Sequence, residues 1–390
     1  MRHSFLSHAG LQLRFAAFSA LLLWSGCAAA RAEGHLPAVE MSSITDVLGN
    51  VSGGLKRGAR VLEKADITAN YAGDDHGLPG FSVFVGAQVT DATLFSAALV
   101  GDAQTVSNID APAGIRLSNA WVAKEFNGRG GIKAGVLDLN TEFDVQATGA
   151  LFLNSSFGIG ADFSQSGGNG PSIFPTTGLG MVGWWMPGGH WQIKGGIFEG
   201  APGDPAHPGR TSFSFSDDEG ALLVAEARNQ ITPNFTLGLG AWRYTSSFDA
   251  IDPMRGRLSG NSGFYAIADG LLYADPAGEN TGLSGWLRLG MANTRINPVA
   301  HSIGGGLVYT GIFGRMADQA GVAFSRVQFG QPARLAAGSG YAETTLEASY
   351  SFNINEKLTL QPDLQYVVSP SGDPTLGNAL VVGSRIIATW

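Results

Sequence analysis

The sequence predicts an all-β fold, a transmembrane antiparallel β-barrel of about 16 strands, and three observations lead to this prediction. The first is composition: among 390 residues there are 56 glycines and 22 phenylalanines, and only 14% are charged. An average soluble domain has about 25% charged residues and about 7% glycine. The second is an alternation of apolar and polar residues along most of the chain. The third is that these segments run to about ten residues, the length that a tilted strand needs to cross a bilayer.

Residues 1–32 are predicted to be a cleaved secretory signal peptide. Arg2 and Arg14 precede a short apolar run, and Ala30-Arg31-Ala32 gives the small-residue pattern of a cleavage site after Ala32. An alternative is lipoprotein processing at Cys27, although Trp24 stands where that motif has an aliphatic residue. Both interpretations predict export. The rest of the chain has no basic patch, which argues against a nucleic-acid partner.

Residues 33–59 do not alternate, and they are predicted to form a short periplasmic N-terminal lead. Apolar residues recur there at helical spacing, at positions Ile44, Val47, Leu48, Val51 and Leu55. Ser43 and Asp46 have the spacing of a capping box. A short helix or a disordered lead is therefore expected before a barrel of residues 60–390.

Alternating segments predict the strands of the barrel. They cover residues 61–72, 81–90, 94–101, 115–126, 131–138, 178–186, 190–199, 221–230, 234–246, 262–273, 282–294, 300–313, 319–329, 341–352, 356–368 and 379–390. The weakest is 94–101, which also fits a helical turn. The number is even, as in closed bacterial barrels, and short connections alternate with long ones, which is typical of periplasmic turns and external loops.

A water-soluble β-sandwich also alternates with period two, and it is the alternative fold. In the segment that begins at Trp191, apolar Ile193 and Ile197 alternate with polar Gln192 and Lys194. Charges of this kind occur along the length of the polar face, which is typical of a face that lines water inside a membrane barrel. The final segment ends on Trp390, and its apolar face resembles the signal that the barrel-assembly machinery of the outer membrane reads.

The longest connection carries the most specific motifs. They are Leu137-Asp138-Leu139-Asn140-Thr141-Glu142-Phe143, Phe152-Leu153-Asn154-Ser155-Ser156-Phe157-Gly158-Ile159-Gly160 and Gly170-Pro171-Ser172-Ile173-Phe174-Pro175. These motifs resemble the OprB family of carbohydrate-selective porins, and the similarity extends from about residue 60 to the end. The resemblance implies a sixteen-stranded outer-membrane barrel that passes sugars.

Residues 139–177, between the fifth and sixth predicted strands, are expected to fold inward as a constriction loop. A loop of this length is uncommon in a compact fold unless it is functional. The candidate constriction residues are Asn140, Glu142, Asp144 and Asn154 from the loop, with Lys133, Lys194, Arg288 and Arg385 from the wall and Trp286 as a candidate sugar platform. The alternation does not fix whether the side chains of Arg116 and Arg228 point into the lumen or outward. Two alternatives stay open: the cations serve only to hydrate the lumen, and Trp286 faces lipid in an aromatic girdle.

Metal and enzyme chemistry find little support in the sequence. The acidic run from Asp138 to Asp144 is similar to a calcium loop, but Phe143 and Gly149 occupy the positions that need Gly and Glu. The seven histidines are scattered without metalloprotease spacing. No catalytic residue, cofactor or metal is therefore expected.

Passive diffusion of monosaccharides and polyols through a water-filled channel in the outer membrane of a Gram-negative bacterium is the preferred hypothesis. A general diffusion porin without sugar selectivity and a plugged barrel that serves as an adhesin or anchor are the alternatives. The expected partners are permeating sugars, outer-membrane lipid and lipopolysaccharide, and the assembly machinery through Trp390. Monomer and homotrimer both stay open.

Overall fold

A computed structural model describes residues 37–390 except 92, 214–217, 277 and 279–280, and it contains sixteen strands in these residues. The predicted signal peptide lies outside the described residues. The strands are β1 (Ala38–Ser52), β2 (Gly58–Ala72), β3 (Phe81–Thr90), β4 (Gly114–Phe126), β5 (Gly130–Leu137), β6 (Gly178–Gly188), β7 (Trp191–Glu199), β8 (Ala221–Thr232), β9 (Phe235–Asp249), β10 (Arg257–Ala274), β11 (Gly282–Ala292), β12 (Val299–Thr310), β13 (Gln319–Phe329), β14 (Ala342–Asn355), β15 (Leu358–Val368) and β16 (Ala379–Thr389).

The helical elements are short and lie in the connections. They are the 3-10 helices η1 (Asp74–His76), η3 (Leu139–Thr141), η4 (Thr148–Leu151), η5 (Ser155–Phe157), η6 (Pro253–Arg255), η7 (Ile312–Gly314) and η8 (Pro370–Gly372), the π-helix η2 (Ser96–Val100), and the α-helices α2 (Ala161–Ser164) and α3 (Gln331–Ala337). In the described part of the chain, no helix is long and apolar enough to cross a membrane.

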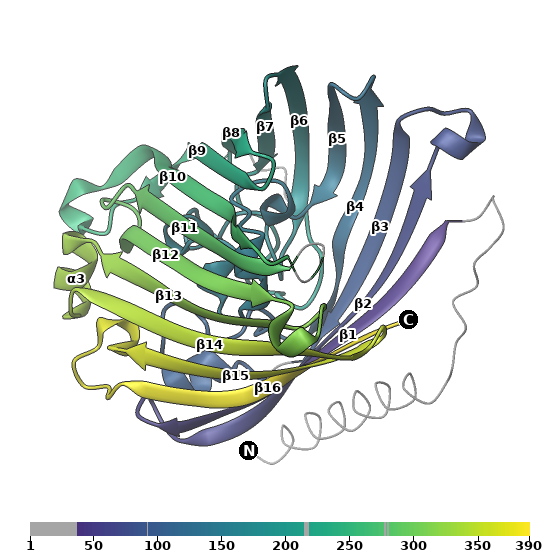
Figure 1. Ribbon diagram of the computed structural model, residues 1–390. Helices are drawn as coiled ribbons and strands as arrows, with labels where there is room; N and C mark the ends of the chain where they lie inside the picture. Colours follow the sequence, from purple (N-terminus) through teal and green to yellow (C-terminus); the bar gives the residue numbers. More distant parts are fainter. Residues whose placement is uncertain (1–36, 92, 214–217, 277, 279–280) are drawn as a thin grey trace, which may run out of the picture.

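The strands form one closed antiparallel barrel in which each strand pairs with its neighbours in the sequence and β1 pairs with β16 (Figure 1). The β1–β16 register runs from Ser42 opposite Thr389 to Ser52 opposite Leu380. Beyond it, the Trp390 amide donates to the Met41 carbonyl at 2.9 Å. The predicted fold class is confirmed.

The expectation for residues 33–59 was wrong, because β1 occupies most of this stretch and closes the barrel. Apolar residues lie on both faces of β1, so its sequence does not show the apolar–polar alternation of a half-buried strand. Val47 faces outward and is 46% exposed, whereas Leu48 faces inward and is 1% exposed. Asp46 points inward and binds Arg385 on β16 instead of capping a helix.

The expectation of a strand at 94–101 was also wrong, since this stretch holds the π-helix η2. Residues 93–113, in the connection after β3, turn into the barrel, and their apolar side chains pack against the wall. Phe95, Leu99 and Val106 share a buried cluster with Leu48 and Val381. These apolar side chains are buried inside the barrel, so residues 94–101 do not have to form a strand that faces lipid.

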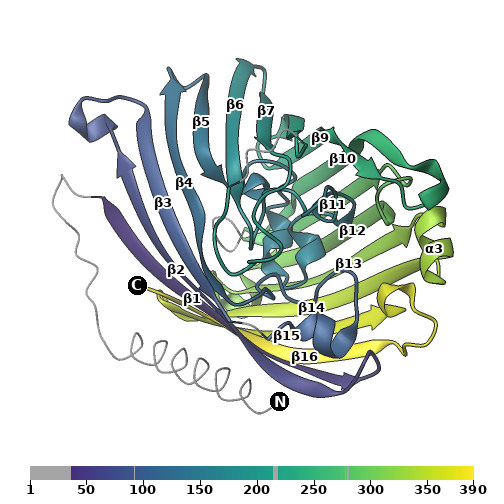
Figure 2. The same ribbon diagram turned by 180° about the vertical axis from the view of Figure 1, so that it is seen from behind.

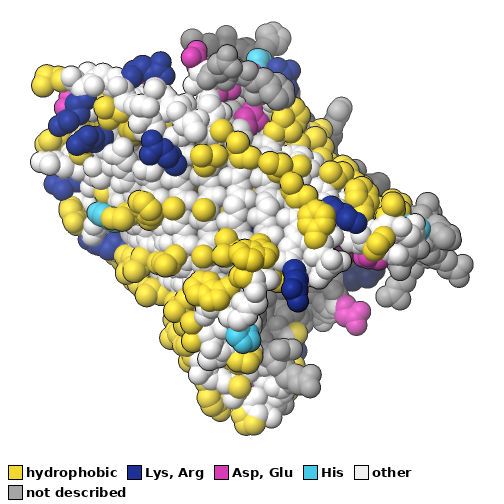
Figure 3. Space-filling view, turned by 90° about the horizontal axis from the view of Figure 1, so that it is seen from above, with side chains coloured by type: hydrophobic (Ala, Val, Ile, Leu, Met, Phe, Trp, Pro, Cys, Tyr) yellow, Lys and Arg dark blue, Asp and Glu magenta, His cyan; other side chains and the backbone are white. Residues whose placement is uncertain are grey.

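The surface has the polarity of a membrane protein, with apolar residues outside and charged residues inside. Outward-facing Val61, Val122 and Leu239 are 45%, 49% and 68% exposed. Rows of hydrophobic side chains cross the face shown in Figure 3. Inside, Glu343 is fully buried and Arg288 is 1% exposed. Water-soluble proteins rarely bury charge or expose large apolar patches in this way.

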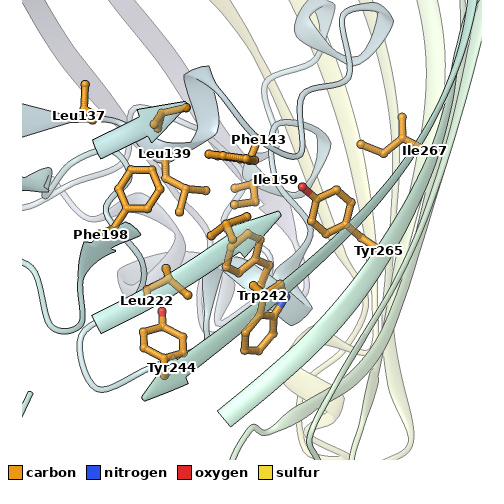
Figure 4. Packing of buried hydrophobic residues seen from close by; sticks show 13 residues of the cluster. Leu137, Leu139, Phe143, Ile159, Phe198, Leu222, Trp242, Tyr244, Tyr265 and Ile267 are labelled. Atoms are coloured by element: carbon orange, nitrogen blue, oxygen red, sulfur yellow. The ribbon is translucent and has the colours of Figure 1, made fainter. Parts of the chain in front are cut away.

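The main apolar core lies between an inward connection and the wall. Residues 138–177, between β5 and β6, bring Phe143 and Ile159 against strands β5 to β10 (Figure 4), and Phe163 belongs to the same cluster. The Phe163 ring stacks on Trp242 with centroids 5.0 Å apart and planes 3° apart. This core holds the connection against one side of the barrel.

Candidate functional site

The connection 138–177 lies inside the ring of strands in both ribbon views (Figures 1 and 2). Acidic side chains of the wall hold it by accepting hydrogen bonds from its backbone. Glu347 on β14 accepts from the Leu153 amide at 2.6 Å, and Glu226 on β8 accepts from the Asp144 amide at 3.0 Å. The wall therefore fixes the backbone of this segment on the side formed by β8 to β15.

Arg288 on β11 makes the largest polar contact with this segment. Its Nε lies 2.8 Å from Asp144 Oδ1, its Nη2 lies 2.7 Å from Asp144 Oδ2, and its Nη1 lies 2.6 Å from Asp162 Oδ1. All three side chains are at most 1% exposed. Burial raises the pKa of Asp144 to about 6, while the adjacent guanidinium acts in the opposite direction.

The placement of Arg288 and Asp144 differs from the sequence prediction, which gave both of them to the pore lining. Arg288 lies beneath the inward segment, and Asp144 lies on the side of that segment that faces the wall, so both are buried. Strand parity orients Arg288 inward correctly, but it does not reveal that a loop covers the side chain. Their role is to pin the segment to β11.

Glu142, Lys133 and Lys194 meet in the lumen, as the sequence predicted for loop carboxylates and wall cations. Glu142 Oε1 pairs with Lys133 Nζ on β5, and Oε2 lies 3.2 Å from Lys194 Nζ on β7. The side chains are 11%, 19% and 18% exposed, respectively. One carboxylate between two ammonium groups, all partly exposed, offers both acceptors and donors to a hydroxylated solute.

An aromatic column extends from this cluster toward β3. Lys133 Nζ lies 4.4 Å from the ring centroid of Trp121 on β4. Phe84 on β3 stacks on the same indole with centroids 5.5 Å apart and planes 11° apart. The cation–π contact stabilises the position of Lys133, because the face of an indole ring attracts an ammonium group.

Asn140 and Asn154 shape the inward segment rather than a binding surface. Asn140 Nδ2 lies 3.2 Å from each of the carbonyl oxygens of Phe143, Asp144 and Gly158. Asn154 Oδ1 accepts from the Ser156 amide at 3.0 Å and is the N-cap of η5. Asn154 is 1% exposed, so its predicted place in the pore lining was wrong.

Trp286 and Arg385 are also buried, in contrast to their predicted positions at the constriction. Trp286 is 5% exposed and packs edge-to-face on Phe157 of the inward segment, with centroids 5.8 Å apart. This contact excludes the lipid-girdle alternative. Arg385 Nε lies 2.7 Å from Asp46 Oδ1, where β16 joins β1. Both residues support the structure around the lumen.

The two residues of uncertain orientation have polar partners inside the barrel. Arg116 donates to Thr90 Oγ1 and to the carbonyls of Pro112 and Pro208. Arg228 Nε lies 2.6 Å from Glu226 Oε1, and its side chain is 20% exposed. Arg228 is therefore the one that keeps partial access to solvent.

A second inward segment, residues 93–113, shares the interior with the first. The Asn108 amide donates to the Leu153 carbonyl at 2.7 Å, and the Ser155 amide donates to the Thr105 carbonyl at 3.0 Å. Glu343 on β14 accepts from the Ala103 amide at 2.7 Å. The two segments thus form one hydrogen-bonded unit within the barrel.

The inward-facing side chains that remain exposed to solvent show which part of the barrel interior is accessible. In the described part of the chain, the charged side chains on the inner face of β8 to β16 are almost fully buried, apart from Arg228. Along β2, β5 and β7, Lys64, Lys133 and Lys194 are 16%, 19% and 18% exposed. Among the described residues, no group of His, Cys, Asp and Glu has the arrangement of a metal site.

Comparisons with known proteins agree with this architecture. The sequence profile described as "Carbohydrate-selective porin, OprB family" matches residues 85–389. The chain belongs to the OprB family. It is 23% identical over 235 residues to Porin B of Pseudomonas aeruginosa, a match that covers 50% of this chain and about half (51%) of that protein.

Solved structures of an OprB protein share the fold. The high-pH structure of Pseudomonas putida OprB superposes with a TM-score of 0.81 at 19% identity, covering 91% of this chain and 94% of that chain. The low-pH structure of that protein gives a TM-score of 0.57 at 17% identity, covering 91% and 93%. Membership of the OprB family, together with the barrel fold, indicates the outer membrane of a Gram-negative bacterium.

Sequence reasoning missed several residues that organise the interior of this OprB-family barrel. They are Asp46, Asp162, Glu226, Glu343 and Glu347 in the anchoring contacts and Trp121 beside Lys133. A usable signal existed for two of them, because Glu343 and Glu347 lie on the polar face of an alternating segment. An acid on that face with no cation near it in the sequence is a candidate acceptor for loop amides.

Proposed function

We propose that this protein lets small neutral carbohydrates, monosaccharides and polyols, diffuse passively across the outer membrane through its water-filled lumen. The observation that carries the proposal is the partly exposed cluster of Glu142, Lys133 and Lys194. Sugar hydroxyls donate to the carboxylate and accept from the ammonium groups, so the cluster binds a neutral polyol without strongly favouring one ion sign. Family membership supports the same substrate class.

The partial exposure of Glu142, Lys133 and Lys194 on the inner side of the barrel supports the proposal that they form the constriction. A sixteen-stranded barrel without a filled interior leaves an aqueous channel. Residues 93–113 pack on Leu48 of β1, Leu62 of β2 and Val381 of β16, and residues 138–177 pack on strands β5 to β10. The proposed path of a solute runs past the partly exposed Lys64, Lys133 and Lys194. Weak binding at the cluster allows release, so we expect modest selectivity.

A plugged barrel is the second candidate, because the two inward segments are hydrogen-bonded to each other and to the wall. Single-channel recording in planar bilayers, with and without glucose, separates the possibilities. A sugar-selective channel gives conductance steps that glucose partly blocks. A plugged barrel gives no steps, and a general porin gives steps that glucose hardly changes.

Glu142→Gln tests the cluster itself. Loss of the carboxylate leaves Lys133 and Lys194 without their shared counter-charge, so the reversal potential in a KCl gradient shifts toward anion preference and the glucose block weakens. Glu356→Gln, in the exposed turn between β14 and β15, is the matched control. An unchanged reversal potential and glucose block in Glu142→Gln would show that the cluster lies outside the conduction path.

We also propose that residues 1–32 direct export and are removed. Trp390, paired with Met41 at the strand seam, would end the segment that the assembly machinery reads. Removal of Trp390 should then lower the amount of barrel that reaches the outer membrane, as measured in membrane fractions.

A further inference from the structure

Trp184 on β6 presents an indole to the lumen beside the charged cluster. Val182, two residues earlier, is fully buried in the core, and the next residue, Trp185, is 57% exposed on the outer surface. Side chains alternate between the two faces of a strand. Trp184 therefore faces inward and Trp185 faces lipid, so two adjacent tryptophans of one strand lie on opposite sides of the wall.

The glycine opposite Trp184 lets the indole lie close to the wall. Gly131 on β5 is its register partner. A Cβ atom at Gly131 would lie only 2.2 Å from the Cζ2 atom of Trp184. Because a side chain is missing there, the ring rests against the backbone of β5 and leaves the lumen beside it open.

Other inward tryptophans have rings that are already engaged. Trp121 carries Phe84 and the Lys133 ammonium group, Trp242 stacks on Phe163, and Trp286 packs on Phe157. For the residues that the structure describes, no ring or cation contact of this kind involves Trp184, and its side chain is partly exposed. Of these four inward indoles, Trp184 is the one that is partly exposed and has no ring or cation against it among the described residues.

Register places this indole next to a hydroxyl-binding group. Trp184 pairs directly with Lys194 on β7, and directly opposed residues of an antiparallel pair have Cβ atoms about 4.5–5.5 Å apart. Lys194 in turn contacts Glu142, both at the carboxylate and at the main-chain carbonyl, the latter at 3.1 Å. An apolar ring and a donor–acceptor pair thus stand side by side on one wall.

We propose that Trp184 and Lys194 form a subsite for the pyranose ring of a sugar, with the indole against the apolar C–H face and the ammonium group on a ring hydroxyl. A pyranose has one polar rim and two flatter faces that carry C–H groups, and an aromatic ring complements such a face. The inference rests on the proposed function and deepens it, since it predicts a preference for a cyclic sugar over an open-chain polyol.

The test compares Trp184→Leu, Trp184→Phe and the outward control Trp185→Leu in planar bilayers and in liposome swelling. Leucine keeps apolar bulk but removes the aromatic face, whereas phenylalanine keeps a ring. We expect the half-blocking glucose concentration to rise roughly threefold to tenfold in Trp184→Leu, on the scale of a single aromatic contact. Trp184→Phe should recover most of the block, and Trp185→Leu should match the wild type.

Mannitol, an open-chain polyol of similar size, separates stacking from a change in pore width. In Trp184→Leu the glucose preference should fall while the mannitol swelling rate stays the same. Equal changes for both solutes, or an unchanged glucose block in Trp184→Leu, would overturn the subsite. A wild-type channel that glucose does not block would instead overturn the proposed function, and with it the inference that rests on it.

Discussion

Arg288 offers the sharpest test of how the inward segment 138–177 is held. Its guanidinium group binds Asp144 through two nitrogens, at 2.8 and 2.7 Å, and Asp162 through Nη1 at 2.6 Å. A hydrogen bond to Ser302 Oγ at 2.8 Å completes the set. In Arg288→Met the bulk of the side chain largely stays, but both carboxylates lose their counter-charge in a site that water does not reach.

The expected cost follows from this burial. Removing one partner of a buried ion pair destabilises a protein by about 3–5 kcal/mol, because the remaining charge is left unpaired. Asp144 and Asp162 are both 0% exposed, so neither is solvated in place. The β-strands do not depend on this contact, and the segment is expected to detach locally. A loss of about 3 kcal/mol shifts the ratio of docked to detached segment by about 100-fold.

Single-channel recording measures the consequence. Arg288→Met should give larger and noisier conductance steps and a weaker glucose block, while far-UV circular dichroism keeps its β-sheet form. A triple variant that combines Arg288→Met with Asp144→Asn and Asp162→Asn also removes the two unpaired negative charges. It should recover most of the wild-type behaviour. If Arg288→Met conducts and is blocked like the wild type, the segment is fixed by other contacts and the reasoning is refuted.

Two other polar contacts carry predictions. Burial, and secondly repulsion from Glu343, raise the pKa of Asp102 to about 8; because this folded-state value exceeds the unfolded one, the stabilisation is complete at low pH and is lost as pH rises through about 8. The loss takes place between the ordinary carboxyl pKa of about 4 and the folded-state value of about 8. Noise in the single-channel current should therefore grow over this range and level off above pH 8, and Asp102→Asn should abolish this dependence. Arg385→Met leaves the buried Asp46 carboxylate without its partner where β16 joins β1, so it should lower the free energy of unfolding in detergent by about 3–5 kcal/mol. The control Arg243→Met, at an exposed position, should change this free energy little.

Strand prediction from the sequence succeeded where the inner face of the wall is polar. Segments such as β7 and β15 alternate cleanly, since one face meets lipid and the other meets water or charged partners. β1 was missed because its inner face contributes Leu48 to a core with Phe95 and Leu99. The same core explains the error at residues 94–101, whose apolar side chains are covered inside the barrel. Local periodicity does not report on an apolar contact made across the lumen.

The candidate site was predictable to a similar extent. Strand parity oriented Lys133, Lys194 and Arg288 inward, and the motif at the loop start supplied Glu142. Parity does not distinguish a charge that meets water from one that lies beneath a loop, because this depends on where residues 138–177 dock. Arg288 and Arg385 were therefore assigned to the pore, although both are buried ion-pair partners.

The buried charges have a physical reason in the architecture of the barrel. Much of the inward wall is polar, so it cannot hold the two inward segments by an apolar core along its whole length. Arg288 donates charge-assisted hydrogen bonds to Asp144, and Glu226, Glu343 and Glu347 accept them from backbone amides of the segments. These directional contacts favour one docked arrangement. Because these groups bind the two segments, few inward-facing charges remain exposed to solvent. Under the proposed function, selectivity is then left to Glu142 with its two lysines, and we expect a substitution there to change what the pore passes without changing how its interior is built.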